Sequence, residues 1–352
     1  MFIFLLFFFS IQQIQSHSKP SLHIVKSPVA DLRFQPESAA PHLKLPTTDI
    51  TNAGQVTQLL FGEYIQAFGT TIDQDNKMWL WIHALQQERF DPDLHWHGYP
   101  GWILADDLQP IEQFSQHNVI TQAMMTPIFN HNQNITQYFS IGSRLCATRI
   151  NETWWQFLLD DKQIAYVHHH HLYFLDNTVQ ETPEQLRENI IKKAKEFLGN
   201  LYSWGGRSAQ DDTRIVSSVD CSALVNLCFL ANGLQIPRMS HEQFLRSNKI
   251  ANCQDLQPAD LIFFVSITKQ SLRMDHVMMY LGNDQILEST AADDQKVRII
   301  SFSDRFGKNC NSIQNNDIIE WNNEHFHVFF GSFLNDPTLI QKLRDNALKF
   351  NY

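Results

Sequence analysis

A cysteine at the predicted start of a helix has the residue type and the setting that nucleophilic chemistry requires. Cys221 follows Asp220 and precedes Ser222 where a loop gives way to a helical pattern. The first N–H groups of a helix lack partners within the helix, and the helix dipole is positive at that end. This setting favours the thiolate, and the same N–H groups can stabilise an oxyanion. An ordinary buried helix cysteine is the alternative that the position alone leaves open.

A histidine and a glutamate offer the base and the orienting acid that such a thiol would need. His276 opens a predicted strand, and Glu288 lies on the next strand, beyond a turn at 282–284. Both numbers are even, and residues two apart in a strand share a face of the sheet. In a hairpin they would be opposed or diagonal neighbours, so the carboxylate would hold the imidazole in one tautomer. A strand-edge histidine with an unrelated surface glutamate is the alternative.

The remaining cysteines have other expected roles. Five cysteines in 352 residues are too few for a disulfide-built scaffold, and an odd count leaves at least one thiol unpaired. Cys253 and Cys310 lie in loop-like contexts and are able to form a disulfide. Cys146 and Cys228 have apolar neighbours, which predicts small buried side chains.

Histidines at two places invite a metal-site interpretation that the sequence does not support. His95 and His97 would share a strand face, but no Asp, Glu or Cys at ligand spacing supports a site. The four histidines at 168–171 would point alternately to opposite faces of a strand. We therefore expect surface or loop positions for these histidines, and neither a metal nor another cofactor.

The elements that carry the candidate chemistry lie in a predicted α+β region over residues 179–334. A helix over 182–197 begins with Thr182 as N-cap, a proline in the first turn and a glutamine that completes a capping box. A second helix covers 220–233 and stops at an Asn-Gly pair. Helices followed by strands indicate helices packed on an antiparallel sheet, and a helical tail is expected within 335–352. The predicted strands are 261–265, 276–281, 285–288 and 297–300.

The N-terminal half consists of two sets of short predicted strands. The first set covers 21–112 and includes the aromatic run at 78–82. The second set covers 113–178 and includes runs at 140–145 and 154–157. In each set an apolar strand ends at a Gly-containing turn and a Trp-bearing strand follows. The pattern predicts two small all-β units that are diverged copies of one another.

Composition and charge indicate a folded, exported protein of two or three domains. The chain is 43% hydrophobic and 18% charged, which is typical of globular proteins. A formal charge of −10 argues against non-specific binding to nucleic acid or to an anionic membrane surface. A continuous apolar run followed by polar residues predicts a signal peptide over 1–16, with an N-terminal anchor as the alternative. No other segment is long and apolar enough to span a membrane.

Five motifs of the α+β region occur in the order seen in one family. They are Tyr202-Ser203-Trp204-Gly205-Gly206, Asp220-Cys221-Ser222, Ile236-Pro237-Arg238, the run 256–264, and the run 276–282. Over residues 185–334 the chain thereby resembles the NlpC-type peptidoglycan cysteine peptidases, a papain-like family. The resemblance implies Cys221 as nucleophile, His276 as base and Glu288 where the family usually has a third histidine. It also implies that Tyr202 and Ser222 line the active site and that Asp220 buttresses the loop.

The N-terminal half is similar to the two SH3-like barrels of the γ-D-glutamyl-L-diamino-acid peptidases. The runs at 58–63 and 98–102 carry this similarity. It implies that Glu63 and Tyr99 close the cleft and bind the free amino group of L-Ala. That subgroup has an acid after the Pro-Arg pair, where this chain has Met239. The other substrate-binding residues implied by the resemblance are Trp204, Arg238 and Ser240.

Together the resemblances imply a secreted or periplasmic bacterial cysteine peptidase. Its expected reaction is hydrolysis of the amide bond between γ-D-glutamate and diaminopimelate or lysine in peptidoglycan stem peptides, through a thioester. Fragments with a free N-terminal L-Ala are the expected substrates. Two other functions stay open at this point. One is cell-wall binding with an inactive or weakly active catalytic domain, and the other is acyl or amide transfer through the same thioester.

Overall fold

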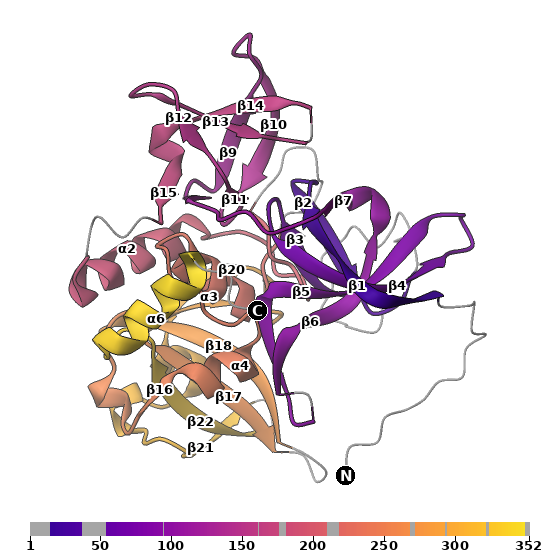
Figure 1. Ribbon diagram of the computed structural model, residues 1–352. Coiled ribbons are helices and arrows are strands. Elements are labelled where there is room, and N and C mark those ends of the chain that lie inside the picture. Colours follow the sequence, from indigo (N-terminus) through magenta and orange to yellow (C-terminus); the bar gives the residue numbers. More distant parts are fainter. Residues whose placement is uncertain are drawn as a thin grey trace.

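The chain folds into mostly β structure, with its helices gathered in the C-terminal half (Figure 1). The computed structural model describes residues 15–36, 54–93, 95–160, 162–175, 181–209, 218–267, 272–292, 294–321 and 324–348. The predicted signal peptide lies almost entirely outside the described residues. Among those residues, no helix combines the length and the apolar character that crossing a membrane requires.

The first β unit is a seven-stranded antiparallel sheet in the order β3-β2-β6-β5-β4-β1-β7. Alternate side chains of its strands point inward, so that Leu32, Ile65 and Ile82 are fully buried in one cluster. Strands β5 and β6 form a long hairpin that extends beyond the sheet and contacts α4. The elements are β1 (Gln15–Val25), β2 (Val29–Arg33), β3 (Gln55–Leu60), β4 (Tyr64–Ile72), β5 (Met78–Asp91), β6 (His95–Leu104), η2 (Ala105–Asp107), β7 (Leu108–Ile111) and α4 (Ser240–Arg246).

The second β unit consists of a five-stranded sheet, β10-β9-β14-β13-β12, and a three-stranded sheet, β11-β8-β15. A turn with Gly142 at φ +91° separates β10 from β11, so a strand of this unit ends at a Gly-containing turn, as the sequence predicts. The histidine run ends β14 and forms η3. The elements are β8 (Val119–Thr121), β9 (Met125–Phe129), β10 (Ile135–Ser140), β11 (Arg144–Leu145), β12 (Thr148–Arg149), β13 (Trp154–Leu158), β14 (Ile164–His168), η3 (His169–His171) and β15 (Leu172–Phe174).

The two β units share hydrophobic packing. Phe61, which follows β3, belongs to the core cluster of the second unit and stacks on Phe139 with ring centroids 4.2 Å apart. The assignment of the two units as SH3-like barrels, with boundaries at 112 and 178, stays a prediction.

The C-terminal half packs helices on an antiparallel sheet of order β16-β22-β17-β18-β19-β20, with β21 beside β22. Both predicted helices are confirmed, and α2 begins with the predicted capping box of Thr182 and Gln185. The predicted tail helix is α6, which packs into the hydrophobic core that α2 and α3 share. The elements are α2 (Pro183–Glu196), α3 (Cys221–Leu230), β16 (Asn248–Ile250), η4 (Cys253–Asp255), β17 (Leu261–Ile267), β18 (Leu272–Gly282), β19 (Gln285–Ser289), β20 (Val297–Ser301), α5 (Phe302–Phe306), η5 (Cys310–Ser312), β21 (Ile318–Trp321), β22 (Glu324–Ser332) and α6 (Pro337–Leu348).

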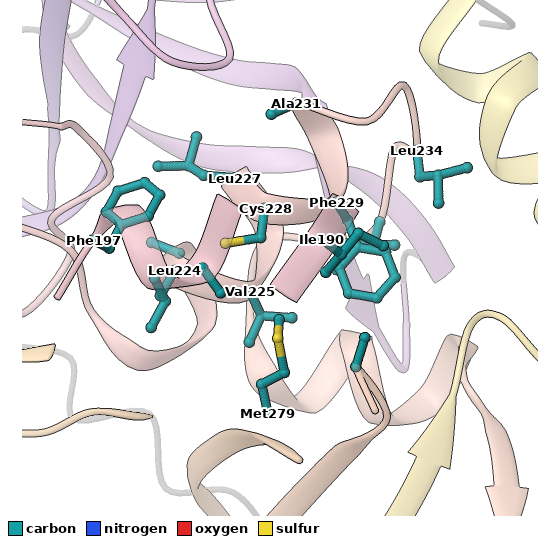
Figure 2. Close-up of a cluster of buried hydrophobic side chains, with 14 of the residues drawn as sticks. Ile190, Phe197, Leu224, Val225, Leu227, Cys228, Phe229, Ala231, Leu234 and Met279 are labelled. Carbon is teal, nitrogen blue, oxygen red and sulfur yellow. The ribbon is translucent and has the colours of Figure 1, made fainter. Parts of the chain in front are cut away.

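Helix α3 is the central element of this half, because all ten of its residues are buried. A helix that is apolar on every side must be enclosed by other elements. Figure 2 shows Cys228 among Phe197, Leu224 and other apolar side chains of this core. Burial raises the pKa of the Cys228 thiol, and its predicted role as a small buried side chain is confirmed.

The other cysteines divide into one disulfide and one exposed thiol. Cys253 and Cys310 form a disulfide between η4 and η5, with Cα atoms 5.6 Å apart. Cys146 is exposed, so the prediction that it is buried is wrong. It follows the short strand β11, where its thiol donates to the carbonyl of Gln116.

Candidate active site

The N-terminus of α3 is fixed by the residue before Cys221. Asp220 is the N-cap, and its Oδ1 accepts a hydrogen bond from the N–H of Ala223 at 2.8 Å. Its Oδ2 accepts one from the N–H of Gly205 at 3.1 Å, which ties the 202–206 loop to the helix. Cys221 occupies the first helical position and is 8% exposed. The cysteine therefore lies at the positive end of the helix dipole, as the sequence predicts.

A buried arginine holds this N-cap residue in place. Arg238 Nη2 lies 2.7 Å from Asp220 Oδ2, and Arg238 Nη1 lies 2.9 Å from Asp220 Oδ1. The same Nη1 donates to the hydroxyl of Ser222 at 2.9 Å. Asp220 and Ser222 thus flank Cys221 and share one guanidinium. Arg238 supports the loop around the cysteine through these two neighbours.

His276 and Glu288 are brought together as their spacing predicts. Strands β18 and β19 pair Met279 with Leu287, so Glu288 is a diagonal neighbour of His276. The imidazole Nε2 lies 2.8 Å from Glu288 Oε2. Cys221 acts on the same imidazole, because its hydrogen bonding and its charge both raise the pKa of His276. The structure therefore aligns a thiol, an imidazole and a carboxylate.

The protonation of this group follows from its contacts. Burial lowers the pKa of His276, but hydrogen bonds and charge interactions with Cys221 and Glu288 outweigh burial and raise the pKa to about 10. Burial raises the pKa of Glu288, yet hydrogen bonding and the charges around it lower the pKa to about 2. Glu288 is therefore ionised at neutral pH, and the imidazolium is the favoured form of His276.

Two arginines at this site were missed by the sequence analysis. Arg298 Nη2 lies 2.9 Å from Glu288 Oε1, and Arg305 Nε lies 3.0 Å from the same oxygen. Arg298 is the direct cross-strand partner of Glu288 on β20. The alternation of β19 and β20 gave a signal for Arg298, but nothing local indicated that α5 would bring Arg305 to the same carboxylate.

Tyr202 lies beside the cysteine. Burial raises the pKa of its phenol, and the nearby negative charges of Cys221 and Asp220 raise it further. The hydroxyl therefore keeps its proton and can donate a hydrogen bond. In the neighbouring Trp204, the indole Nε1 is one of the buried polar atoms of the described residues that have no hydrogen-bond partner.

Glu63 is enclosed by the protein. It is 1% exposed, and its Oε1 lies 2.9 Å from Arg207 Nη1. Its Oε2 accepts from Gln87 Nε2 at 3.0 Å and from the N–H of Leu60 at 3.3 Å. Oε1 has no hydrogen-bond partner among the described residues, so its contact with Arg207 is an ion pair with which a substrate amine would have to compete.

Tyr99 lies between the first β unit and the helical half. The charges of Arg238, Glu242 and Asp220 all act on its phenol, and burial raises the pKa of that phenol. Glu242 is a second group that the sequence analysis missed. It is buried in the first turn of α4, where its Oε1 accepts from the N–H of Phe90 at 3.2 Å. No short-range sequence signal links Glu242 to Tyr99.

The two remaining predicted residues near Arg238 have structural surroundings. Met239 packs against the core of the first β unit, which explains an apolar residue at this position. Ser240 is buried at the start of α4. The histidines at 95, 97 and 168–171 lie on strands and in η3, away from Cys221 in the sequence.

Comparison with known proteins finds similar sequences for the helical half. Residues 199–314 match the model described as the NlpC/P60 family. The gamma-D-glutamyl-L-lysine dipeptidyl-peptidase of Bacillus cereus is 26% identical over 261 residues, which cover 72% of this chain and 73% of that protein. The peptidoglycan endopeptidase RipB of Mycobacterium tuberculosis is 35% identical over 114 residues, which cover 31% of this chain and 45% of RipB. The match thus spans less than half of RipB.

A solved structure agrees with the overall fold. The crystal structure of an NlpC/P60 family protein from Bacillus cereus superposes with a TM-score of 0.61 at 22% sequence identity. The superposition covers 80% of this chain and 94% of that one. The similarity therefore includes the N-terminal β units as well as the helical half.

Proposed function

We propose, from the premise that residues 199–314 belong to the NlpC/P60 family, that this chain is a cysteine peptidase of peptidoglycan stem peptides. The bond that it cleaves is the amide between the γ-carboxyl of D-glutamate and the following diamino acid. One observation carries the proposal. His276 Nε2 lies 2.8 Å from Glu288 Oε2, and Cys221, at the positive end of α3, raises the pKa of the same imidazole. This arrangement supplies a thiolate, a proton carrier and an orienting acid.

The reaction proceeds in two steps. The Cys221 thiolate attacks the γ-carbonyl carbon, and the resulting oxyanion accepts hydrogen bonds from N–H groups at the start of α3 and from the Tyr202 hydroxyl. The C–N bond then breaks, His276 gives its proton to the leaving amine, and a thioester remains on Cys221. In the second step His276 takes a proton from water, whose oxygen attacks the thioester. The free γ-carboxylate leaves and the thiolate returns.

Short fragments with a free L-Ala amine are the proposed substrates. The Bacillus cereus relative is a dipeptidyl-peptidase, which supports an enzyme that cleaves after the second residue from a free N-terminus. Tyr99 and a carboxylate beside it would receive the amine. Glu242 acts on Tyr99 through its charge and accepts a hydrogen bond from the N–H of Phe90, whereas Glu63 Oε1 lies 2.9 Å from Arg207 Nη1. We therefore assign the amine to Glu242 first and to Glu63 as the alternative. Action outside the cytoplasm is part of the same proposal.

Defined peptides test the function directly. Purified wild-type protein and Cys221→Ala would be incubated with L-Ala-γ-D-Glu-diaminopimelate and L-Ala-γ-D-Glu-L-Lys, each with a free or an acetylated amine. Mass spectrometry would identify the products. We expect release of the diamino acid from the free-amine peptides by wild type alone. Equal release by Cys221→Ala, or cleavage at another bond, would overturn the proposal.

A further inference from the structure

The carboxylate of Glu288 has contacts with three cationic side chains from three elements. Oε2 contacts His276 Nε2 of β18 at 2.8 Å. Oε1 accepts from Arg298 Nε at 3.0 Å and from Arg298 Nη2 at 2.9 Å. It also accepts from Arg305 Nε at 3.0 Å. Three N–H groups on one oxygen exceed its two lone pairs, so Oε1 has no acceptor capacity left for the imidazole.

Because Glu288 is buried, these contacts are needed to stabilise its negative charge. Glu288 is 0% exposed, and the side chains of Arg298 and Arg305 are 15% and 7% exposed. An ionised carboxylate in such a place is costly unless cations and donors surround it. One imidazole alone would provide this only while it is protonated, whereas the two guanidinium groups stay charged throughout the reaction.

The second arginine is delivered by a small, well-anchored element. Helix α5 is capped by Ser301, whose hydroxyl accepts from the N–H of Asp304 at 2.9 Å. Phe302 and Phe306 of the same helix are buried in the core cluster beside the sheet. Arg305 therefore projects from a fixed turn rather than from a loose loop.

We propose that Arg298 and Arg305 are positioning residues for the reaction, because they occupy Oε1 of Glu288 and leave Oε2 to hold His276. The inference rests on the proposed function, because that function assigns His276 the role of a base. An uncharged acceptor would also orient the imidazole. The two arginines explain how a charged glutamate can fill that role. Without the two guanidinium groups, a buried glutamate would either take up a proton or bind the imidazolium too strongly for proton transfer.

The proposal has a signature in pH dependence. The charged or titratable groups around Glu288 are His276 on β18, Arg298 on β20, Arg305 on α5, Cys221 on α3 and Tyr202 in the loop before α3. Asp294 lies 3.9 Å from Arg298. Loss of one positive charge stabilises the imidazolium and destabilises the thiolate. The pH at which the thiolate forms and the pH at which the imidazolium loses its proton would both rise.

Alkylation of Cys221 by iodoacetamide reports both pH values without a substrate. They appear as an acid limb, where the thiolate forms, and an alkaline limb, where the imidazolium loses its proton. The rate would be followed from acid to alkaline pH by mass spectrometry of the Cys221 peptide, in wild type, Arg298→Gln, Arg305→Gln and Arg305→Lys. We expect each glutamine variant to shift both limbs upward by about half a pH unit or more. On the acid limb such a shift is a threefold or larger fall in rate at fixed pH. Arg305→Lys keeps the charge, so its limbs should coincide with those of wild type.

Arg187→Gln is the matched control, because Arg187 forms an equally buried ion pair with Asp260, at 2.8 Å, outside the site. It should lower stability and leave both limbs in place. Limbs that coincide in wild type and both glutamine variants would overturn the proposal, as would equal shifts in Arg305→Gln and Arg305→Lys. If Arg298→Gln does not fold, Arg305→Gln decides, since Arg305 lies outside the sheet. Failure of peptide hydrolysis by wild type would overturn the proposed function and leave this measurement valid.

Discussion

Arg238 Nη2 lies 2.7 Å from Asp220 Oδ2, so the residue directly before Cys221 is held by a fully buried guanidinium. Asp220 uses the same carboxylate to cap α3 and to bind the 202–206 loop. One ion pair thereby fixes both the start of the helix and the loop that carries Tyr202. The geometry of the cysteine depends on it.

Asp220→Asn tests this dependence. Asparagine keeps the shape and is a good N-cap, but it removes the charge that compensates Arg238. Breaking a buried pair in this way costs about 3 kcal/mol or more. We expect the free energy of unfolding in urea to fall by that amount and the rate of peptide hydrolysis to fall as well. Glu196→Gln breaks the surface pair with Lys193 and is the control, with little change expected in either quantity. Equal stability of the two variants would contradict the prediction.

Glu288→Gln changes the pH dependence in a defined direction. Glu288 raises the pKa of His276, so its loss should lower that pKa and move the alkaline limb of activity to lower pH. The variant should also lose at least about tenfold in kcat, because the imidazole loses its charged partner. A pH–rate profile on the free-amine peptide measures both effects. An alkaline limb that stays in place would show that Glu288 does not act on His276.

The free energy of unfolding should fall at both acid and alkaline pH because of the His276–Glu288 pair. The folded pKa of His276 lies above its unfolded value of 6.5, so its contribution is complete below about 6.5 and is lost as pH rises through about 10. The folded pKa of Glu288 lies below its unfolded value of 4.5, so its contribution is lost as pH falls from about 4.5 through about 2. Urea unfolding at alkaline pH should show a smaller decline in Cys221→Ala, which lacks one partner of His276. An identical decline would argue against the pairing.

Amine recognition is tested by comparing two acids. Glu242→Gln should raise KM about tenfold or more for peptides with a free L-Ala amine, since a hydrogen bond to a charged group contributes about 1.5–3 kcal/mol. Acetylated peptides should stay uncleaved, as they do with wild type. Glu63→Gln should lower stability instead, because Arg207 would lose its carboxylate. A selective rise in KM for Glu63→Gln alone would move the amine site to Glu63.

The disulfide should contribute to stability. Cys253 and Cys310 are 57 residues apart in the sequence, for which the chain-entropy model gives about 4 kcal/mol. Replacing both by serine should lower the free energy of unfolding in urea by a large part of this amount. Cys146→Ser, which removes an exposed thiol, is the control and should change stability little. A reductant should then affect wild type and leave the double variant unchanged.

Local patterns predicted the elements of the helical half and the central contact of its site. The capping residues of α2 and the start of α3 follow from side chains within four positions of each helix end, and the His276–Glu288 contact follows from strand alternation. Arg305 and Glu242 could not be found in this way, since their neighbours at Glu288 and Tyr99 come from elements that meet only after folding. Cys146 was misplaced because apolar neighbours along a short strand do not fix which side faces solvent.

The polar contacts between the first β unit and the helical half determine whether the helical half can be separated from the rest of the chain. Thr57 accepts from Arg238 Nε at 2.8 Å, and Gln58 Oε1 accepts from the N–H of Arg207 at 2.8 Å. Both arginines are fully buried, so a chain cut between the β units and α2 would leave them without these acceptors. The helical half is therefore not a freely portable module. Fusion or exchange of this half between proteins would have to carry the strand β3 that completes it.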